Sequence, residues 1–148
     1  MRMRELYTLS FGQIDLAKRT VHLSKTKNGD KRNVPLSSVA GTLLADAFAA
    51  RPEHTPKDLL FPFWNGDRSP RALEDTTERV SKYFGAVFDE AGCPDFDFHC
   101  TRGEAICRLV LRTTLSDTQI ARITGHKDPR MLRRYMNLRG SELAPLLW

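Results

Sequence analysis

The sequence predicts an α+β fold that is mainly α-helical, with a small antiparallel β-sheet or hairpin near the N-terminus. Residues 20–24 and 33–36 alternate apolar and polar side chains, and the Asn28-Gly29 pair between them is typical of a tight hairpin turn. After residue 37 the apolar residues recur mostly at intervals of three and four, which is the spacing of a helix with one buried side.

Length and composition indicate one soluble globular domain. The chain has 148 residues, of which 41% are hydrophobic and 28% are charged, and this is enough to bury one core. No apolar run approaches the length that a membrane-spanning helix needs. The basic N-terminal residues are not followed by the apolar segment of a secretory signal. We therefore expect a cytoplasmic protein without membrane contact.

The three cysteines predict reduced thiols rather than a metal site. Cys93, Cys100 and Cys107 are spaced seven residues apart, whereas paired zinc ligands are usually separated by shorter gaps. An odd number of cysteines in a chain without an export signal favours free thiols that pack as small apolar side chains.

Positive charge is concentrated at the two ends of the chain. Residues 1–36 hold eight Lys/Arg and three Asp/Glu (+5), residues 37–98 hold six and eleven (−5), and residues 99–148 hold nine and four (+5). If the two ends meet in space they form one basic face, which would suit a polyanion such as nucleic acid. The acidic middle third is expected to be core and scaffold.

The N-terminal segments are expected to be a helix followed by the sheet. Residues 2–10 favour a helix with Leu6 and Leu9 on its apolar side, and residues 13–15 favour a short strand. The hairpin tip can enter a DNA groove or an active-site cleft, or it can be a solvated edge protected by lysines, and the residues alone leave both open. The cations at this tip are Lys25, Lys27, Lys31 and Arg32.

Two helices joined by a long loop are expected in the middle third. Ser37 or Ser38 can cap the first helix, and four prolines between residues 51 and 71 predict the loop. The apolar residues of the first helix are Val39, Leu43, Leu44, Ala47 and Phe48. The second helix is expected over residues 72–90, and its inward residues are Leu73, Val80, Tyr83, Phe84, Val87 and Phe88.

The last third carries a defined joint between two helices. A capping box at residues 116–119 predicts the start of one helix, and Gly125 supplies the left-handed turn that ends it. Asp128, followed by a proline, then caps a new helix. His126 lies in this joint, and Tyr135 follows about two turns into the new helix. By itself, Tyr135 is expected to be a core residue with its hydroxyl at the rim.

Taken together, the motifs resemble those of the tyrosine recombinase (phage integrase) family. That family has an Arg followed three residues later by Glu-Leu, a Lys at a hairpin tip, a His-x-x-Arg, a Gly-His, and a Tyr nine residues after the second His. These positions are held here by Arg2 with Glu5-Leu6, Lys27, His99 with Arg102, Gly125-His126, and Tyr135. The resemblance covers essentially the whole chain and implies the fold of the DNA breaking-rejoining enzymes.

The resemblance implies that Tyr135 is a nucleophile that attacks a DNA phosphodiester. It would become joined to the 3′ phosphate and free a 5′ hydroxyl, so the strand could be rejoined to another end without ATP. The implied partners are double-stranded DNA and further copies of the chain, because the family works as a homo-tetramer on two duplexes. Residues 139–148 would then dock on a neighbour or fold back onto their own chain.

The resemblance also implies roles for the cationic residues. Arg2 and Arg102 would bind the non-bridging phosphate oxygens through their planar guanidinium groups. Lys27 would protonate the leaving 5′ oxygen, and His99 and His126 would bind the phosphate or handle protons. These cations would replace a metal ion, so no cofactor is implied.

The chain departs from the family pattern in three respects, which are the residues beside Arg102, the helices before the first Arg, and the absence of the separate N-terminal domain that clamps the far side of the DNA. Cys100, Thr101 and Gly103 stand where the family usually has Asp, Leu and His, and a glycine inside a helix costs about 1 kcal/mol relative to alanine. Family domains also have further helices before the first Arg. We therefore expect residues 1–148 to be a single catalytic domain that lacks the N-terminal core-binding domain and the first catalytic-domain helices.

Other functions stay open at this point. A catalytically inactive, truncated DNA-binding remnant would bind DNA in a salt-sensitive manner without forming a covalent adduct. A structural or dimerisation fragment would have no DNA role. Topoisomerase-like relaxation of DNA uses the same chemistry as recombination.

Overall fold

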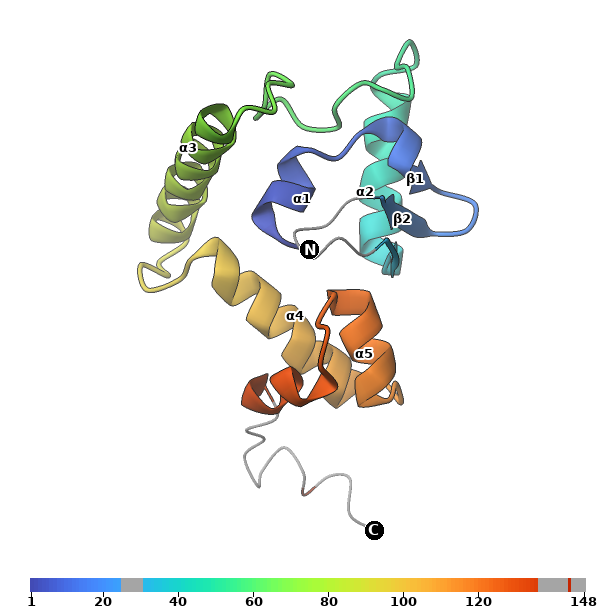
Figure 1. Ribbon diagram of the computed structural model, residues 1–148, viewed down its shortest axis with the longest axis vertical. Coiled ribbons are helices and arrows are strands. Elements are labelled where there is room, and N and C mark those ends of the chain that lie inside the picture. The colour runs from blue at the N-terminus through green and yellow to red at the C-terminus, as the bar shows by residue number, and fades with distance from the viewer. Residues whose placement is uncertain (25–30, 136–143, 145–148) are drawn as a thin grey trace. The chain divides into compact units, whose positions relative to one another are not determined.

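The computed structural model describes residues 1–24, 31–135 and 144, and Figure 1 shows its helices and strands. The chain divides into two compact units, Met1–Phe98 and His99–Trp148. A three-stranded antiparallel sheet lies in the first unit, and the other elements of the described ranges are helical. The predicted α+β, mainly helical class is therefore confirmed.

The sheet has the order β1-β2-β3, formed by β1 (Ile14–Asp15), β2 (Thr20–Leu23) and β3 (Arg32–Pro35). Both pairings are antiparallel, and the register of the second pair ends with Leu23 opposite Arg32. The predicted strands are confirmed. The hairpin turn between β2 and β3, with Lys25, Lys27 and Asn28-Gly29, lies outside the described residues.

The predicted helix over residues 2–10 is wrong in its length. The helix α1 covers only Met3–Tyr7, and a short 3-10 turn, η1 (Phe11–Gln13), precedes β1. Tyr7, Leu9 and Phe11 are 0%, 3% and 2% exposed, so alternate residues are buried. Ser10 is extended and pairs with Leu59 in an antiparallel bridge, and Leu60 N donates to Leu9 O at 2.8 Å. The chain after Tyr7 therefore bonds to a distant segment instead of continuing α1.

The first unit buries two apolar clusters. One cluster lies on the sheet, and α2 (Ser38–Ala49), capped by Ser37 as predicted, packs Leu44 and Phe48 against it. In Figure 1 α2 lies beside the strands. The other cluster joins Tyr7 to Trp64 and to Val80 of α3 (Pro70–Glu90).

The inward side of α3 is narrower than predicted. Leu73, Val80 and Phe84 take part in the core cluster, but Tyr83 and Val87 are exposed, so the prediction for these two residues is wrong. Each of them precedes an inward position by one residue, which turns its side chain about 100° around the helix and away from the core.

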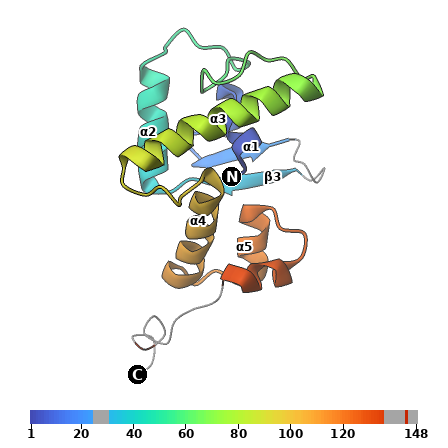
Figure 2. The ribbon, with the colours of Figure 1, turned by 90° about the vertical axis from the view of Figure 1, so that its left-hand side faces the viewer.

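The second unit is helical over its described residues. α4 (Phe98–Arg112) enters it from the first unit, and α5 (Asp117–Thr124) and η2 (Pro129–Tyr135) follow in the unit itself. Ile106 from α4, Ile120 and Ala121 from α5, and Leu132 from η2 form its core. Figure 2 shows the three helical segments. Tyr135 packs at the edge of this core.

The helix predicted to start at Asp128 is a 3-10 helix over its described length. Met131 N donates to the Asp128 carbonyl at 3.0 Å, a bond across three residues, and Arg130 N donates to the Asp128 carboxylate at 2.8 Å. The capping aspartate therefore tightens the first turn. Among the described residues, no helix is long and apolar enough to cross a membrane.

Candidate functional site

The joint between α5 and η2 has the predicted geometry. Ser116 N donates to Gln119 Oε1 at 2.8 Å and Gln119 N donates to Ser116 Oγ at 3.4 Å, so the predicted capping box is confirmed. Gly125 has φ 74°, the left-handed conformation that glycine adopts without strain, and its N–H donates to Ala121 O at 2.8 Å. The helix therefore ends sharply, and His126 follows at a fixed place.

Thr124, the last residue of α5, contacts two of the predicted site residues. Its carbonyl oxygen accepts a hydrogen bond from Arg102 Nη2 at 2.6 Å, and its hydroxyl lies 2.7 Å from His126 Nδ1. Arg102 and Thr124 are 8% and 7% exposed. The final carbonyls of a helix have no partner within the helix and carry partial negative charge, so a guanidinium group is well placed there.

Thr124 is not among the site residues predicted from the sequence. The signal was present, because a threonine in the last turn of a capped helix lies two residues before a histidine held by the same turn. Such a hydroxyl can bond back to its own helix and also reach the histidine ring. The contact with Arg102 gives no such signal, since it joins residues 22 positions apart.

Tyr135 lies near His126 and against α4. The centroids of the His126 and Tyr135 rings are 6.2 Å apart, and Tyr135 is partly buried. A Cβ atom placed on Gly103 would lie 3.5 Å from Cε1 of the Tyr135 ring, which is ordinary contact distance. The glycine that departs from the family pattern thus faces the aromatic ring of the predicted nucleophile.

His99 lies in the first turn of α4, three residues before Arg102, and its side chain is exposed. The spacing places both residues on the same side of the helix. In the second unit Arg102 and His126 therefore both contact Thr124, the Tyr135 ring lies near His126, and His99 lies one turn away from Arg102 on α4.

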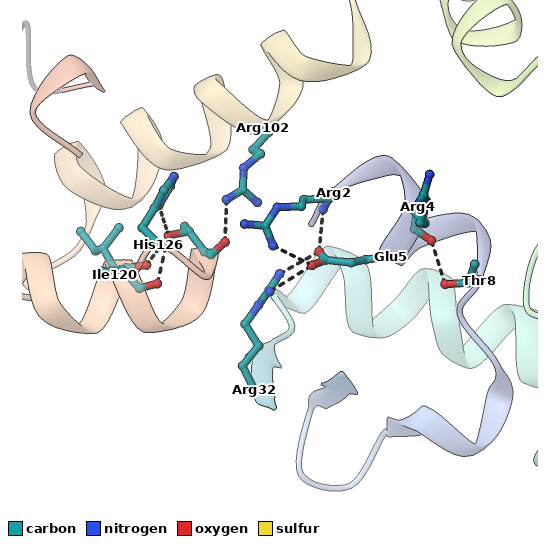
Figure 3. A network of polar contacts seen from close by, with 10 residues as sticks. Arg2, Arg4, Glu5, Thr8, Arg32, Arg102, Ile120 and His126 are labelled. Atoms are coloured by element: carbon teal, nitrogen blue, oxygen red, sulfur yellow. Dashed lines mark hydrogen bonds and ion pairs between the residues drawn. The ribbon is translucent and has the colours of Figure 1, made fainter. Parts of the chain in front are cut away.

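In the first unit, Arg2 is part of a buried ionic network centred on Glu5 (Figure 3). Arg2 N donates to Glu5 Oε2 at 2.7 Å, and Arg2 Nη1 donates to Glu5 Oε1 at 3.1 Å. Arg32 Nη1 and Nη2 donate to the same two oxygens at 3.0 Å and 2.7 Å. Glu5 therefore holds both the backbone and the side chain of Arg2 at the start of α1.

The two arginines determine the charge state of Glu5. Burial raises the pKa of this carboxyl, but the hydrogen bonds and charge of Arg32 and the bonds from Arg2 outweigh it and hold the pKa below its usual value. The carboxylate is therefore ionised at neutral pH. The sequence pattern places Arg32 at the hairpin tip and does not indicate its pairing with Glu5, 27 positions away.

The remaining predicted residue, Lys27, lies outside the described residues. The cysteines Cys93, Cys100 and Cys107 are not joined in disulfides. Within the ranges 1–24 and 31–135, no group of three or more His, Cys, Asp or Glu side chains is arranged to hold a metal ion.

The comparison with known protein families decides which family the chain belongs to. The model of the phage integrase family matches residues 1–142. The chain belongs to the phage integrase family. Its resemblance to the tyrosine recombinases, inferred from the motifs, is thereby confirmed.

Individual members of the phage integrase family show the same relationship. The chain is 31% identical over 147 residues to the shufflon-specific DNA recombinase of Escherichia coli, covering 99% of the chain and 34% of that protein. Across the curated relatives it matches, it spans 34% to 43% of their length. The solved structure of the XerA recombinase has the same fold, with a TM-score of 0.74, 21% identity, and coverage of 98% of this chain and 51% of that one.

Proposed function

We propose that this chain is the catalytic domain of a site-specific DNA recombinase or integrase with Tyr135 as its nucleophile. The Tyr135 oxygen attacks a DNA phosphorus atom, and a bond from phosphorus to this oxygen replaces the bond to the 5′ oxygen. The products are a 3′-phosphotyrosyl linkage and a free 5′ hydroxyl. Reversal of the step with another 5′ hydroxyl rejoins the strand without an external energy source.

The observation that carries the proposal is the grouping of Arg102, His126 and Tyr135 around the end of α5. A phenol is a weak nucleophile at neutral pH, since its ordinary pKa is near 10, so it needs a nearby proton acceptor and a nearby positive charge. The neutral imidazole of His126 can accept a proton, and the guanidinium of Arg102 carries the positive charge. Membership of the phage integrase family supports the assignment.

Arg102 suits stabilisation of the pentavalent transition state. Its guanidinium is permanently charged and planar, and the bond from Nη2 to Thr124 O fixes its orientation before DNA binds. A cation positioned in advance stabilises developing negative charge without reorganising during the reaction. We assign Arg102 to the non-bridging oxygens of the scissile phosphate.

The roles of Arg2, Lys27 and His99 in the proposal rest on the family motifs. Arg2 would bind a non-bridging oxygen, Lys27 would give its proton to the leaving 5′ oxygen, and His99 would bind the phosphate or handle a proton. The network around Glu5 supports Arg2, because it fixes this side chain at the start of α1.

The proposed partner is double-stranded DNA, bound by a homo-oligomer, with a tetramer as the active form. The net charge of +5 and the pI near 9.4 support binding to a polyanion. The shufflon-specific relative is named a DNA recombinase, in agreement with this partner.

Covalent trapping tests the proposal without knowledge of the DNA site. A pool of nicked duplexes with randomised sequence around the nick is incubated with the chain, and the reaction is stopped in SDS. After cleavage the short strand beside the nick diffuses away, so protein and DNA stay joined. The trapped strands are recovered by proteolysis and sequenced. We expect adducts enriched for one sequence.

Two substitutions separate Tyr135 from other tyrosines. Tyr135→Phe should abolish the adduct, and Tyr83→Phe, which removes an exposed phenol from α3, should leave it unchanged. The proposal would be contradicted if Tyr135→Phe formed the adduct. It would also be contradicted if folded wild-type chain formed no adduct. Salt-sensitive DNA binding without adduct would instead identify a DNA-binding domain, and relaxation of supercoiled plasmid without strand exchange would identify topoisomerase-like activity.

A further inference from the structure

The hydroxyl of Thr124 lies among three hydrogen-bonding atoms. Its oxygen is 2.7 Å from the carbonyl oxygen of Ile120, 3.3 Å from that of Ala121 and 2.7 Å from His126 Nδ1. Figure 3 shows the bonds at Ile120 and His126. Thr124 Oγ1 has one proton to donate and can accept through its lone pairs.

The two carbonyl oxygens determine where the hydroxyl proton lies. A carbonyl oxygen can only accept, so a distance of 2.7 Å between Thr124 Oγ1 and Ile120 O requires the hydroxyl proton between them. If that proton pointed to His126 instead, two oxygen atoms would approach each other with no hydrogen between them. The hydroxyl therefore donates to the backbone and accepts from the ring.

We infer that Thr124 is a positioning residue that fixes the tautomer of His126. The ring nitrogen Nδ1 carries a proton and donates it to Thr124 Oγ1, so Nε2 holds the lone pair of the neutral imidazole. Nε2 is then the nitrogen that takes up a proton, and it can donate to a phosphate oxygen only after it has done so. The hydrogen bond at one ring nitrogen thus decides the chemistry of the other.

Thr124 fixes Arg102 by a different atom. Arg102 donates to the backbone carbonyl of Thr124, whereas His126 contacts the side chain. A substitution of the side chain therefore removes the contact with His126 and leaves the acceptor for Arg102 in the backbone.

Thr124→Val is the best test, because valine has nearly the same shape as threonine and lacks the hydroxyl. Thr124→Ser keeps the hydroxyl and loses only a methyl group.

Nitrogen NMR of the full chain measures the tautomer directly. With the histidines labelled with ¹⁵N, and at a pH where the imidazoles are neutral, His126 Nδ1 should resonate at the protonated position and Nε2 at the unprotonated position. Loss of signals in His126→Gln assigns the peaks. Thr124→Val should move His126 toward the Nε2-protonated form that free histidine favours, and Thr124→Ser should not.

Two controls isolate the contact. Thr113, the residue after α4, also donates its hydroxyl to a carbonyl four residues earlier, at 2.6 Å, so Thr113→Val repeats the chemical change away from His126. His54 Nδ1 lies 2.6 Å from the Arg51 carbonyl oxygen and should stay Nδ1-protonated in every variant. A wild-type His126 protonated at Nε2, or a His126 spectrum unchanged in Thr124→Val, would overturn the inference.

The catalytic part of the inference rests on the proposed function, and covalent trapping tests it separately. Thr124→Val should slow adduct formation about 10- to 100-fold, the size of effect that follows the loss of a residue that orients a metal-binding histidine. Thr124→Ser should restore most of the rate. A changed tautomer with an unchanged rate would reject the catalytic role of Thr124. Wild-type chain without adduct would reject the proposed function, and the spectra would still decide the tautomer.

Discussion

Arg32 and Glu5 form a buried bidentate ion pair between β3 and α1. The two nitrogen–oxygen distances are 3.0 Å and 2.7 Å, and the side chains are 8% and 7% exposed. Because Glu5 also accepts two bonds from Arg2, this pair links the end of the β2–β3 hairpin nearest its turn to the first cation of the family motif. Arg32 is the first residue of β3 and lies opposite Leu23.

The first prediction concerns the stability of this network. Arg32→Met should lower the free energy of unfolding by about 3 kcal/mol, because it leaves a buried carboxylate with one of its two cationic partners. Arg32→Lys should recover only part of the loss, since an ammonium group cannot bind both oxygens in the same planar geometry. Urea unfolding followed by circular dichroism measures both values.

The exposed Lys82–Glu78 pair on α3 provides the control for Arg32. Lys82→Met removes a cation of the same charge from a solvated ion pair and should change the stability little. A loss in Arg32→Met no greater than the loss in Lys82→Met would show that the buried pair does not stabilise the first unit.

The second prediction concerns the loss of folding stability at low pH. The pKa of Glu5 is lowered in the folded chain, so its ionised form adds stability above its ordinary pKa of 4.5, and this stability is lost as the pH falls through the lower folded-state pKa. Thermal unfolding between neutral pH and pH 3 should therefore show a steeper loss in wild type than in Glu5→Gln. Asp15, Asp58 and Glu78 also have lowered pKa values, but they titrate in both proteins and cancel in the difference. Parallel curves would argue against the assigned charge of Glu5.

The third prediction concerns Gly103 and the position of the Tyr135 ring that lies against it. Gly103→Ala should stabilise the chain by up to about 1 kcal/mol, because alanine favours the helix and its Cβ would meet Tyr135 Cε1 at an ordinary 3.5 Å. Gly103→Leu should displace the ring, since the further atoms of leucine require the space that the tyrosine occupies. We expect normal adduct formation from the alanine variant and a reduced rate from the leucine variant.

Gly85 provides a matched position for the third prediction. A Cβ on Gly85 of α3 meets nothing within 4 Å, so Gly85→Leu adds the same atoms without touching Tyr135. Equal rates of adduct formation in Gly103→Leu and Gly85→Leu would show that Gly103 does not position the nucleophile.

The features predicted correctly from the sequence depend on residues close together in the chain. The joint at Gly125 follows from capping and turn residues within a few positions of it, and the β2–β3 pairing follows from alternation on both sides of Asn28-Gly29. These local preferences act before any tertiary contact forms.

The features that were missed depend on contacts between distant segments. The helix α1 ends early because the backbone of Leu9 and Phe11 bonds to residues 58–60, and these distant contacts override a weak helical pattern. Glu5 appeared only as part of a motif, because its partner Arg32 is 27 residues away. The contact between Arg102 and Thr124 uses a backbone carbonyl, which is the same in every residue type. Composition and spacing therefore cannot predict this contact.

The last prediction concerns Arg102 itself. Arg102→Met keeps much of the apolar length of the side chain and removes the charge and the bond to Thr124 O. If Arg102 stabilises the transition state, adduct formation should fall about 100- to 1,000-fold, the usual effect of losing one pre-oriented donor.

Arg108→Met on the same helix is the matched control, because Arg108 is exposed and pairs with Glu104 four residues earlier. Since Arg102 is buried, circular dichroism must first show that the variant is folded at the assay temperature. A folded Arg102→Met that forms adduct as fast as Arg108→Met would remove Arg102 from the catalytic site and leave it a structural cap of α5.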